Sequence, residues 1–158
     1  MAKYLFFDDD WKDLGDEVEY IYRKHKDAQD EMTKTIKNRK FGLITDISYK
    51  TSLSIFKVFD RYLKELIEMK RYGKVVQTFP PEEGVKTVSM GTTVIARNLT
   101  DDKEITLTIR SYWVANNDND RVAYNAPLSK VLIGARVGEI REGLIDGVKK
   151  KYEVLEII

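Results

Sequence analysis

A long segment near the start of the chain contains no proline and almost no glycine. Between about residue 10 and residue 72 the only glycines are Gly15 and Gly42, and all three prolines lie later. Proline and glycine interrupt helices, so their scarcity over this length favours long helices. A helix of roughly 30 residues at ~1.5 Å per residue is about 45 Å long, longer than a small domain is wide. The segment therefore predicts a part of the molecule that projects from a globular body.

Apolar residues in this segment recur with the period of a coiled coil. The first seam has alternating spacings of four and three and comprises Leu14, Val18, Ile21, His25, Ala28 and Met32. The second seam comprises Ile55, Phe59, Tyr62, Leu66 and Met69, with Leu53, Phe56, Leu63 and Ile67 on an adjacent face. Two such helices with a short break between them predict an antiparallel helical hairpin. We place this hairpin, the finger, at residues 1–78.

The composition changes after Gly73. The run Pro80-Pro81-Glu-Glu-Gly84 cannot continue a helix and predicts a linker at residues 79–84. Residues 85–158 then form a second domain, in which alternating and Val- and Thr-rich patterns predict strands. The predicted strands are 85–99, 104–114, a short one through 122–124, and a hairpin of 142–145 and 148–158 about Asp146-Gly147.

One short helix interrupts these strands. Pro127 suits a first helical position and Gly134 suits a left-handed stop. The predicted buried side of this helix comprises Leu128, Val131, Leu132 and Ile133. The predicted fold class is therefore α+β: an antiparallel helical hairpin, followed by a small antiparallel β-sheet domain with one short helix.

Composition excludes several classes of function. The net charge of +1 over 158 residues argues against wrapping of nucleic acid by bulk electrostatics, and the absence of cysteine excludes disulfides and thiolate metal sites. The apolar run at the start is too short for a signal peptide or a membrane helix, so we expect a cytoplasmic protein without membrane contact. His25, the only histidine, falls on the first seam, where packing explains it and no catalytic triad can form.

Three runs in the second domain carry a family resemblance. They are Thr87–Val94, Asn125–Glu139 and Lys151–Ile157, and in this order they resemble the C-terminal domain of the bacterial Gre transcript-cleavage factors (GreA/GreB). The family's helix segment usually reads Asn-Ser-Pro, a leucine-rich turn and Gly-Lys, whereas this chain has Asn125-Ala126-Pro127 through Gly134-Ala135 with the same order and spacing. Over the first 80 residues the resemblance lies in architecture and length. It implies an N-terminal coiled coil followed by a domain similar to FK506-binding proteins.

The resemblance also implies a partner. Gre factors bind RNA polymerase through the globular domain and insert the finger into its secondary channel, where the tip reaches the catalytic centre. The polymerase-binding residues would then include Asn125, Ala126, Pro127 and Leu128. The alternative is that these residues only cap and pack the short helix. On the Gre interpretation the chain is a monomer that has no catalytic residue, metal or cofactor of its own and modifies the active site of the polymerase.

The fingertip departs from the family pattern. Cleavage-stimulating members carry two acidic residues three positions apart, which help to hold the second Mg ion of the polymerase. Counting back from the second helix places Leu43 and Asp46 at these positions, and counting forward from the first places Phe41 and Ile44 there. Neither register gives a pair of carboxylates. Asp46 is the one candidate to share that ion, helped by the hydroxyls of Thr45 and Ser48, but Asp46 is also a good N-cap for the second helix.

The other residues near the tip each have two interpretations. The apolar set, Phe41, Leu43 and Ile44, either folds back on the hairpin or faces a partner. The basic set, Lys34, Lys37, Arg39 and Lys40, is either a solvated face or a contact to backtracked RNA or an acidic channel wall. At the opposite end of the finger, Asp8-Asp-Asp10 is best explained as favourable charge at a helix N-terminus rather than as a metal cluster.

These observations favour a Gre-type elongation factor with weak or no cleavage stimulation, acting as an inhibitor or a modulator of pausing. Full cleavage stimulation through Asp46 is the nearest alternative. An FK506-binding-like prolyl isomerase with a helical arm is an alternative of another class, which a peptide isomerisation assay would test. A structural module whose hairpin pairs with another coiled coil is a third, which identification of its bound partners would test.

Overall fold

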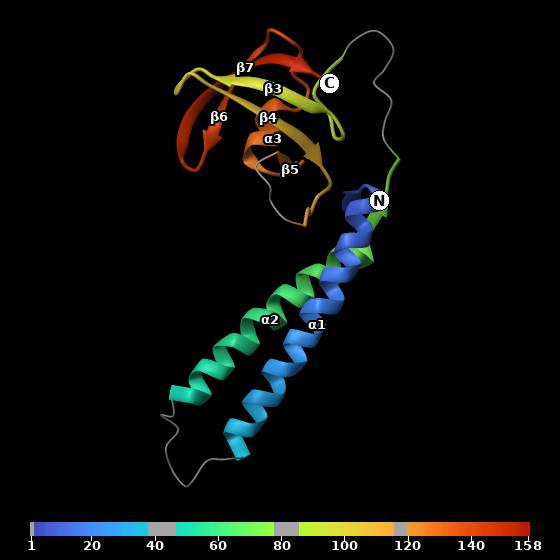
Figure 1. Ribbon diagram of the computed structural model, residues 1–158, viewed down its shortest axis with the longest axis vertical. Coiled ribbons are helices and arrows are strands. Elements are labelled where there is room, and N and C mark those ends of the chain that lie inside the picture. Colours follow the sequence, from blue (N-terminus) through green and yellow to red (C-terminus); the bar gives the residue numbers. More distant parts are fainter. Residues whose placement is uncertain (1, 38–46, 78–85, 116–119) are drawn as a thin grey trace.

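The computed structural model describes residues 2–37, 47–77, 86–115 and 120–158, arranged as a long helical finger and a curled sheet domain (Figure 1). The finger contains β1 (Tyr4–Phe6), α1 (Asp8–Lys37), α2 (Ile47–Tyr72) and β2 (Gly73–Val75). The sheet domain contains β3 (Thr93–Asn98), β4 (Lys103–Arg110), β5 (Arg121–Ala123), α3 (Pro127–Leu132), β6 (Ile140–Ile145) and β7 (Val148–Ile157). The predicted fold class is confirmed, and the predicted linker at 79–84 lies outside the described residues.

The first helix follows its predicted seam. Leu14, Ile21 and Ala28 are buried against α2 at intervals of seven residues, which is the spacing of a coiled coil. Their seam partner His25 is half-buried: its ring lies 4.8 Å from that of Phe56, and its Nε2 is 3.2 Å from a carboxylate oxygen of α2. The two helices extend away from the sheet domain as a projecting rod (Figure 1).

The second helix largely follows its predicted seam, since Phe59, Tyr62 and Met69 pack against the finger core around Leu66. Leu66 is fully buried as expected, but its buried companion is Leu63, which the sequence placed on the adjacent face. Ile55, predicted to lie on the seam, has 47% of its surface exposed. Because α2 has apolar residues on two adjacent faces, periodicity alone could not decide which of them packs most closely against α1.

A two-stranded sheet that the sequence analysis missed closes the base of the finger. Strands β1 and β2 pair in parallel, with Tyr4 opposite Gly73 and Phe6 opposite Val75. Phe6 is fully buried there, and its ring meets that of Trp11 edge-on at 5.2 Å. Main-chain hydrogen bonds between β1 and β2 therefore join the start of α1 to the end of α2.

The larger sheet has the strand order β5-β4-β3-β7-β6. It was predicted to be antiparallel throughout, but β5 pairs with β4 in parallel. The segment after β4 first crosses to the base of the finger, and the chain then returns in the direction of β4. The strand predicted at 85–99 is also shorter, because Gly91 adopts a positive φ of 97° in a turn before β3. The predicted Asp146-Gly147 turn is confirmed by φ values of 52° and 76°.

Helix α3 packs on the inner face of this sheet. Pro127 opens the helix, Leu132 is fully buried and Gly134 has a positive φ of 83°, as predicted. Ile133 does not belong to the buried side: it lies after the last helical residue and is 38% exposed. The core around the helix comprises Val88, Val94, Ala96, Leu107, Ile109, Leu132, Ala135, Tyr152, Val154 and Ile157.

Candidate functional site

Most of the predicted fingertip set lies outside the described residues. This applies to Arg39, Lys40, Phe41, Leu43, Ile44, Thr45 and Asp46. Ser48 lies in the first turn of α2, and Lys34 and Lys37 lie in the last turn of α1. Lys34 is exposed and donates a hydrogen bond to Glu31 at 2.8 Å, which raises the pKa of the lysine above its ordinary value.

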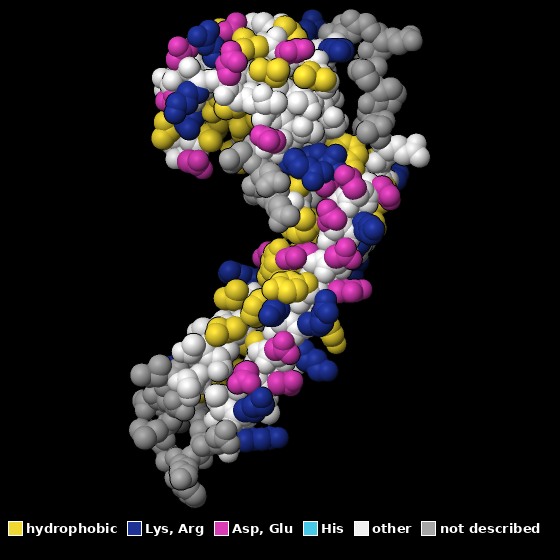
Figure 2. Space-filling view, viewed as in Figure 1, with side chains coloured by type: hydrophobic (Ala, Val, Ile, Leu, Met, Phe, Trp, Pro, Cys, Tyr) yellow, Lys and Arg dark blue, Asp and Glu magenta, His cyan; other side chains and the backbone are white. Residues whose placement is uncertain are grey.

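Charge along the described finger is mixed at its base and basic toward the tip. Acidic and basic side chains are interspersed along most of α1 (Figure 2). The last turn of α1 carries Lys34 and Lys37, whereas the first turn of α2 contains no acidic residue. The described ends of both helices therefore add no carboxylate to the tip.

The predicted polymerase-binding residues Asn125–Leu128 lie together at the start of α3. Pro127 is exposed, Leu128 packs partly into the sheet-domain core, and Ala126 is the N-cap without any side-chain hydrogen bond. The amide oxygen of Asn125 is buried and accepts no hydrogen bond from the described residues. Helix capping therefore explains Pro127 but not the amide of Asn125.

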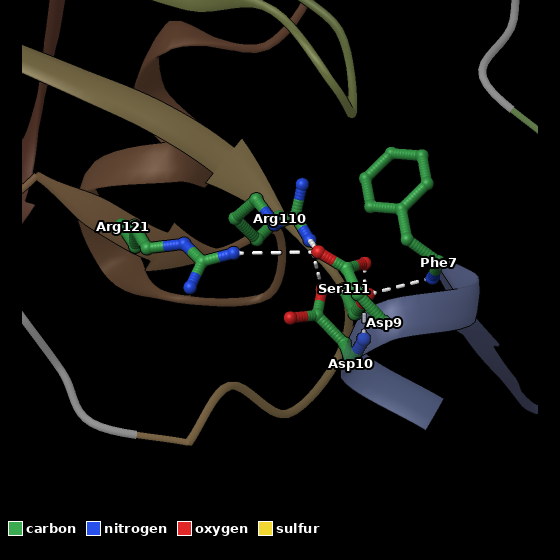
Figure 3. Close-up of polar contacts among 6 residues, drawn as sticks. All are labelled: Phe7, Asp9, Asp10, Arg110, Ser111 and Arg121. Carbon is green, nitrogen blue, oxygen red and sulfur yellow. Dashed lines mark hydrogen bonds and ion pairs between the residues drawn. The ribbon is translucent and has the colours of Figure 1, made fainter. Parts of the chain in front are cut away.

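A polar cluster joins the start of α1 to the ends of β4 and β5, where the finger meets the sheet domain (Figure 3). Asp10, in the first turn of α1, is fully buried and accepts a hydrogen bond from the hydroxyl of Ser111 at 2.5 Å. The same hydroxyl accepts the Phe7 N–H at 2.8 Å. Arg110 contacts Asp10 at 3.1 Å and Asp9 at 2.5 Å, so one guanidinium serves both carboxylates.

The charges of this cluster stabilise one another. Burial opposes the charged form of Asp9, but hydrogen bonds from Arg110 and from the Asp10 N–H outweigh it and lower the pKa of Asp9 below its ordinary value. Burial likewise opposes the charge of Arg110, while its hydrogen bonds to Asp10 and Asp9 raise its pKa. Arg121 adds a longer ion pair to Asp9 at 3.5 Å. Pairing of this kind is what makes a buried carboxylate tolerable.

A pocket of about 630 Å³ lies on the same junction. Glu17 of α1 and Tyr62 of α2 form its wall on the finger side. Tyr112 and Trp113, from the segment that follows β4, also line it. The residues Asn125, Ala126 and Pro127 complete the lining, together with small apolar side chains at positions 114, 115 and 123.

Hydrogen bonds hold the polar groups of this pocket in place. The hydroxyl of Tyr62 donates to Glu17 at 3.3 Å, and the rings of Tyr62 and Trp113 pack against the same finger core. Burial is the main cause that raises the pKa of Tyr62. Tyr112 packs against Tyr4 at 4.4 Å between ring centroids and against Tyr124 at 5.9 Å. The pocket walls are therefore preorganised by contacts between the two domains.

The sequence has recognisable relatives among known proteins. The family model described as "Transcription elongation factor, GreA/GreB, C-term" matches residues 82–158. The GreA of Chloroherpeton thalassium is 27% identical over 144 residues, 86% of this chain and 91% of that protein. The GreA of Nautilia profundicola is 30% identical over 149 residues, 93% of this chain and 89% of that protein. The chain belongs to the GreA/GreB family.

Two solved structures align with this GreA/GreB family member over nearly its whole length. The GreA factor homolog 1 (Gfh1) of Thermus thermophilus has 14% identity and a TM-score of 0.45, covering 98% of this chain and 97% of that one. The GreA/GreB factor of Nitrosomonas europaea has 18% identity and a TM-score of 0.39, covering 98% of each chain.

The junction between the two domains of this GreA/GreB family member has no signature in its sequence. Asp9 and Asp10 do lie in the first turn of α1, as predicted, but their partners Arg110 and Ser111 are about a hundred residues away. A buried acidic residue at a helix start has the same sequence signature as an exposed one. Among the described residues no group of three or more acidic or histidine side chains is arranged to hold a metal ion, and no described helix is long and apolar enough to cross a membrane.

Proposed function

We propose that this GreA/GreB family member binds RNA polymerase through its sheet domain and inserts its finger into the secondary channel. It acts there as an inhibitor or a modulator of pausing, with weak or no stimulation of transcript cleavage. Family membership supports the partner, and the projecting helical hairpin supports the mode of entry (Figure 1). On this proposal the protein is a cytoplasmic monomer that depends on the polymerase for catalytic residues, metal and contact with nascent RNA.

The scarcity of acidic residues near the tip of the finger favours inhibition or pausing over stimulation of transcript cleavage. Between Glu31 and Asp60 the sequence has one carboxylate, Asp46, and six basic residues: Lys34, Lys37, Arg39, Lys40, Lys50 and Lys57. A weakly held second Mg ion needs added oxygen ligands, and hard divalent cations prefer carboxylates. A tip with one carboxylate among basic residues would bind such an ion only weakly. A finger that occupies the channel but supplies no ligand to the metal ion would slow nucleotide addition.

Cleavage stimulation through Asp46 remains the nearest alternative, with Thr45 and Ser48 assisting it. A stalled, backtracked elongation complex separates the two outcomes. We expect the wild-type protein to leave the RNA length unchanged and to slow nucleotide addition once the complex resumes. RNA shortening by the wild-type protein that Asp46→Ala abolishes would establish the alternative instead.

Binding to the polymerase needs a test of its own. We expect the wild-type protein to retain RNA polymerase subunits on an affinity column, and Pro127→Asp to reduce their retention at least severalfold, since Pro127 is exposed at the start of α3. Lys149→Asp, on the β6–β7 hairpin, is the control for a charge change elsewhere on the sheet domain. Equal retention by both variants would move the binding surface away from α3.

A further inference from the structure

The pocket between finger and sheet domain combines three aromatic rings with one carboxylate. Tyr62, Tyr112 and Trp113 supply the rings, and Glu17 supplies the charge. None of the described residues that line the pocket is basic. Its volume of about 630 Å³ lies within the range of ligand-binding pockets.

The carboxylate of Glu17 lacks a cationic partner within the described part of the chain. Its hydrogen-bond donor is the neutral hydroxyl of Tyr62. The two arginines of the junction cluster are engaged elsewhere: Arg110 pairs with Asp9 and Asp10, and Arg121 with Asp9. The pocket therefore presents an uncompensated negative charge beside three aromatic side chains, and aromatic rings also attract cations through their quadrupoles.

We propose that this pocket receives one arginine side chain of RNA polymerase when the sheet domain docks. A planar guanidinium can stack on an aromatic ring and pair with a carboxylate at the same time, which an ammonium group does less well. The partner is assigned to the polymerase because Ala126 and Pro127 belong both to the pocket lining and to the surface proposed to bind it. This inference rests on the proposed function and adds the chemistry of one contact to it.

The pocket can be tested without the polymerase. The chain has two tryptophans, so its indole N–H groups give two signals in an NMR spectrum, and Trp11→Phe assigns them. We expect acetyl-arginine methylamide at millimolar concentration to shift the Trp113 signal and leave the Trp11 signal in place. The neutral isostere acetyl-citrulline methylamide should shift neither. Equal shifts with both probes, or none with either, would overturn the proposal.

A second experiment tests the assigned partner. Glu17→Gln retains the shape and the bond to Tyr62 but removes the charge, so affinity for RNA polymerase should fall about tenfold. Glu19→Gln, the same change at an exposed position of α1, should leave affinity unchanged. If the arginine probe binds but Glu17→Gln does not weaken the polymerase complex, the occupant is a free cation and the polymerase arginine is excluded. If no variant or wild-type protein binds polymerase at all, the proposed function itself fails.

Discussion

The hydroxyl of Ser111 donates a hydrogen bond to the carboxylate of Asp10 at 2.5 Å, linking residues that are 101 positions apart. Both side chains are fully buried. Ser111 also accepts the N–H of Phe7, so this hydroxyl satisfies one group just before α1 and one in its first turn. It is a central contact between the finger and the sheet domain (Figure 3).

Ser111→Ala should therefore destabilise the junction. The change leaves the buried Phe7 N–H without a partner and leaves Asp10 with Arg110 alone. A buried group that loses its hydrogen bond costs about 1–3 kcal/mol. Denaturant unfolding followed by tryptophan fluorescence would measure the loss. Ser54→Ala is the matched control: Ser54 is exposed on α2 and bonds within its own helix, so its loss should change stability by less than about 0.5 kcal/mol.

The ion pairs of Asp9 predict a small sensitivity to acid. The folded-state pKa of Asp9 lies below its ordinary value of 3.8, so its contribution is complete above about pH 5 and is lost as the pH falls through the folded pKa. Because 59% of this side chain is exposed, the contribution should be below about 1 kcal/mol. Thermal unfolding between pH 3 and pH 7 should show a gentler acid slope for Asp9→Asn than for the wild type. An unchanged slope would mean that Asp9 adds nothing to folding.

Two glycines of the finger should respond to alanine in opposite directions. A Cβ at Gly73 would lie 2.5 Å from the carbonyl oxygen of Met69 and 2.5 Å from the ring of Trp11, so Gly73→Ala should cost about 1–3 kcal/mol. A Cβ at Gly15, inside α1, would lie 3.3 Å from Nζ of Lys70, which donates a hydrogen bond to the Trp11 carbonyl and need shift only slightly to make room. Gly15→Ala should stabilise the helix by about 0.5–1 kcal/mol. Thermal unfolding of the two variants beside the wild type would test both signs.

The missing carboxylate pair at the fingertip can be built in. Leu43→Asp places a second acid three positions before Asp46 and should introduce RNA shortening in a backtracked complex, because two carboxylates can assist the weakly held Mg ion. The double change Phe41→Asp and Ile44→Asp tests the other register. Leu53→Asp, which adds the same charge on the described part of α2, should give no cleavage. Activity of one pair and not the other would fix the register, whereas silence of both would show that more than carboxylates is missing.

The sequence was sufficient for features with strong local signals. The absence of proline set the length of the helices, the seam of α1 emerged from its spacing, and Asp146-Gly147 marked its hairpin turn. The start and stop of α3 followed from Pro127 and Gly134 for the same reason. Each of these features depends on residues close together in the chain.

Features that depend on distant residues escaped prediction. Strands β1 and β2 have three residues each, too few for any alternation to be visible, and they pair across about 70 residues. The parallel placement of β5 depends on where the preceding segment crosses the finger base. The junction pocket draws its walls from α1, α2 and the segment after β4, and no local motif indicates such an assembly.

The pairing of β1 with β2 determines how mechanical load passes through the protein. Leu5, in β1, also accepts the N–H of Tyr112 and donates its own N–H to Tyr124, so the strand that ties the two helix ends is bonded directly to the sheet domain. A force applied at the tip of the hairpin is then transmitted to the sheet domain through the hydrogen bonds of β1. The β1–β2 pairing also opposes sliding of the two helices past each other. Bending should consequently occur mainly along the α1–α2 hairpin, away from the base at which β1 pairs with β2.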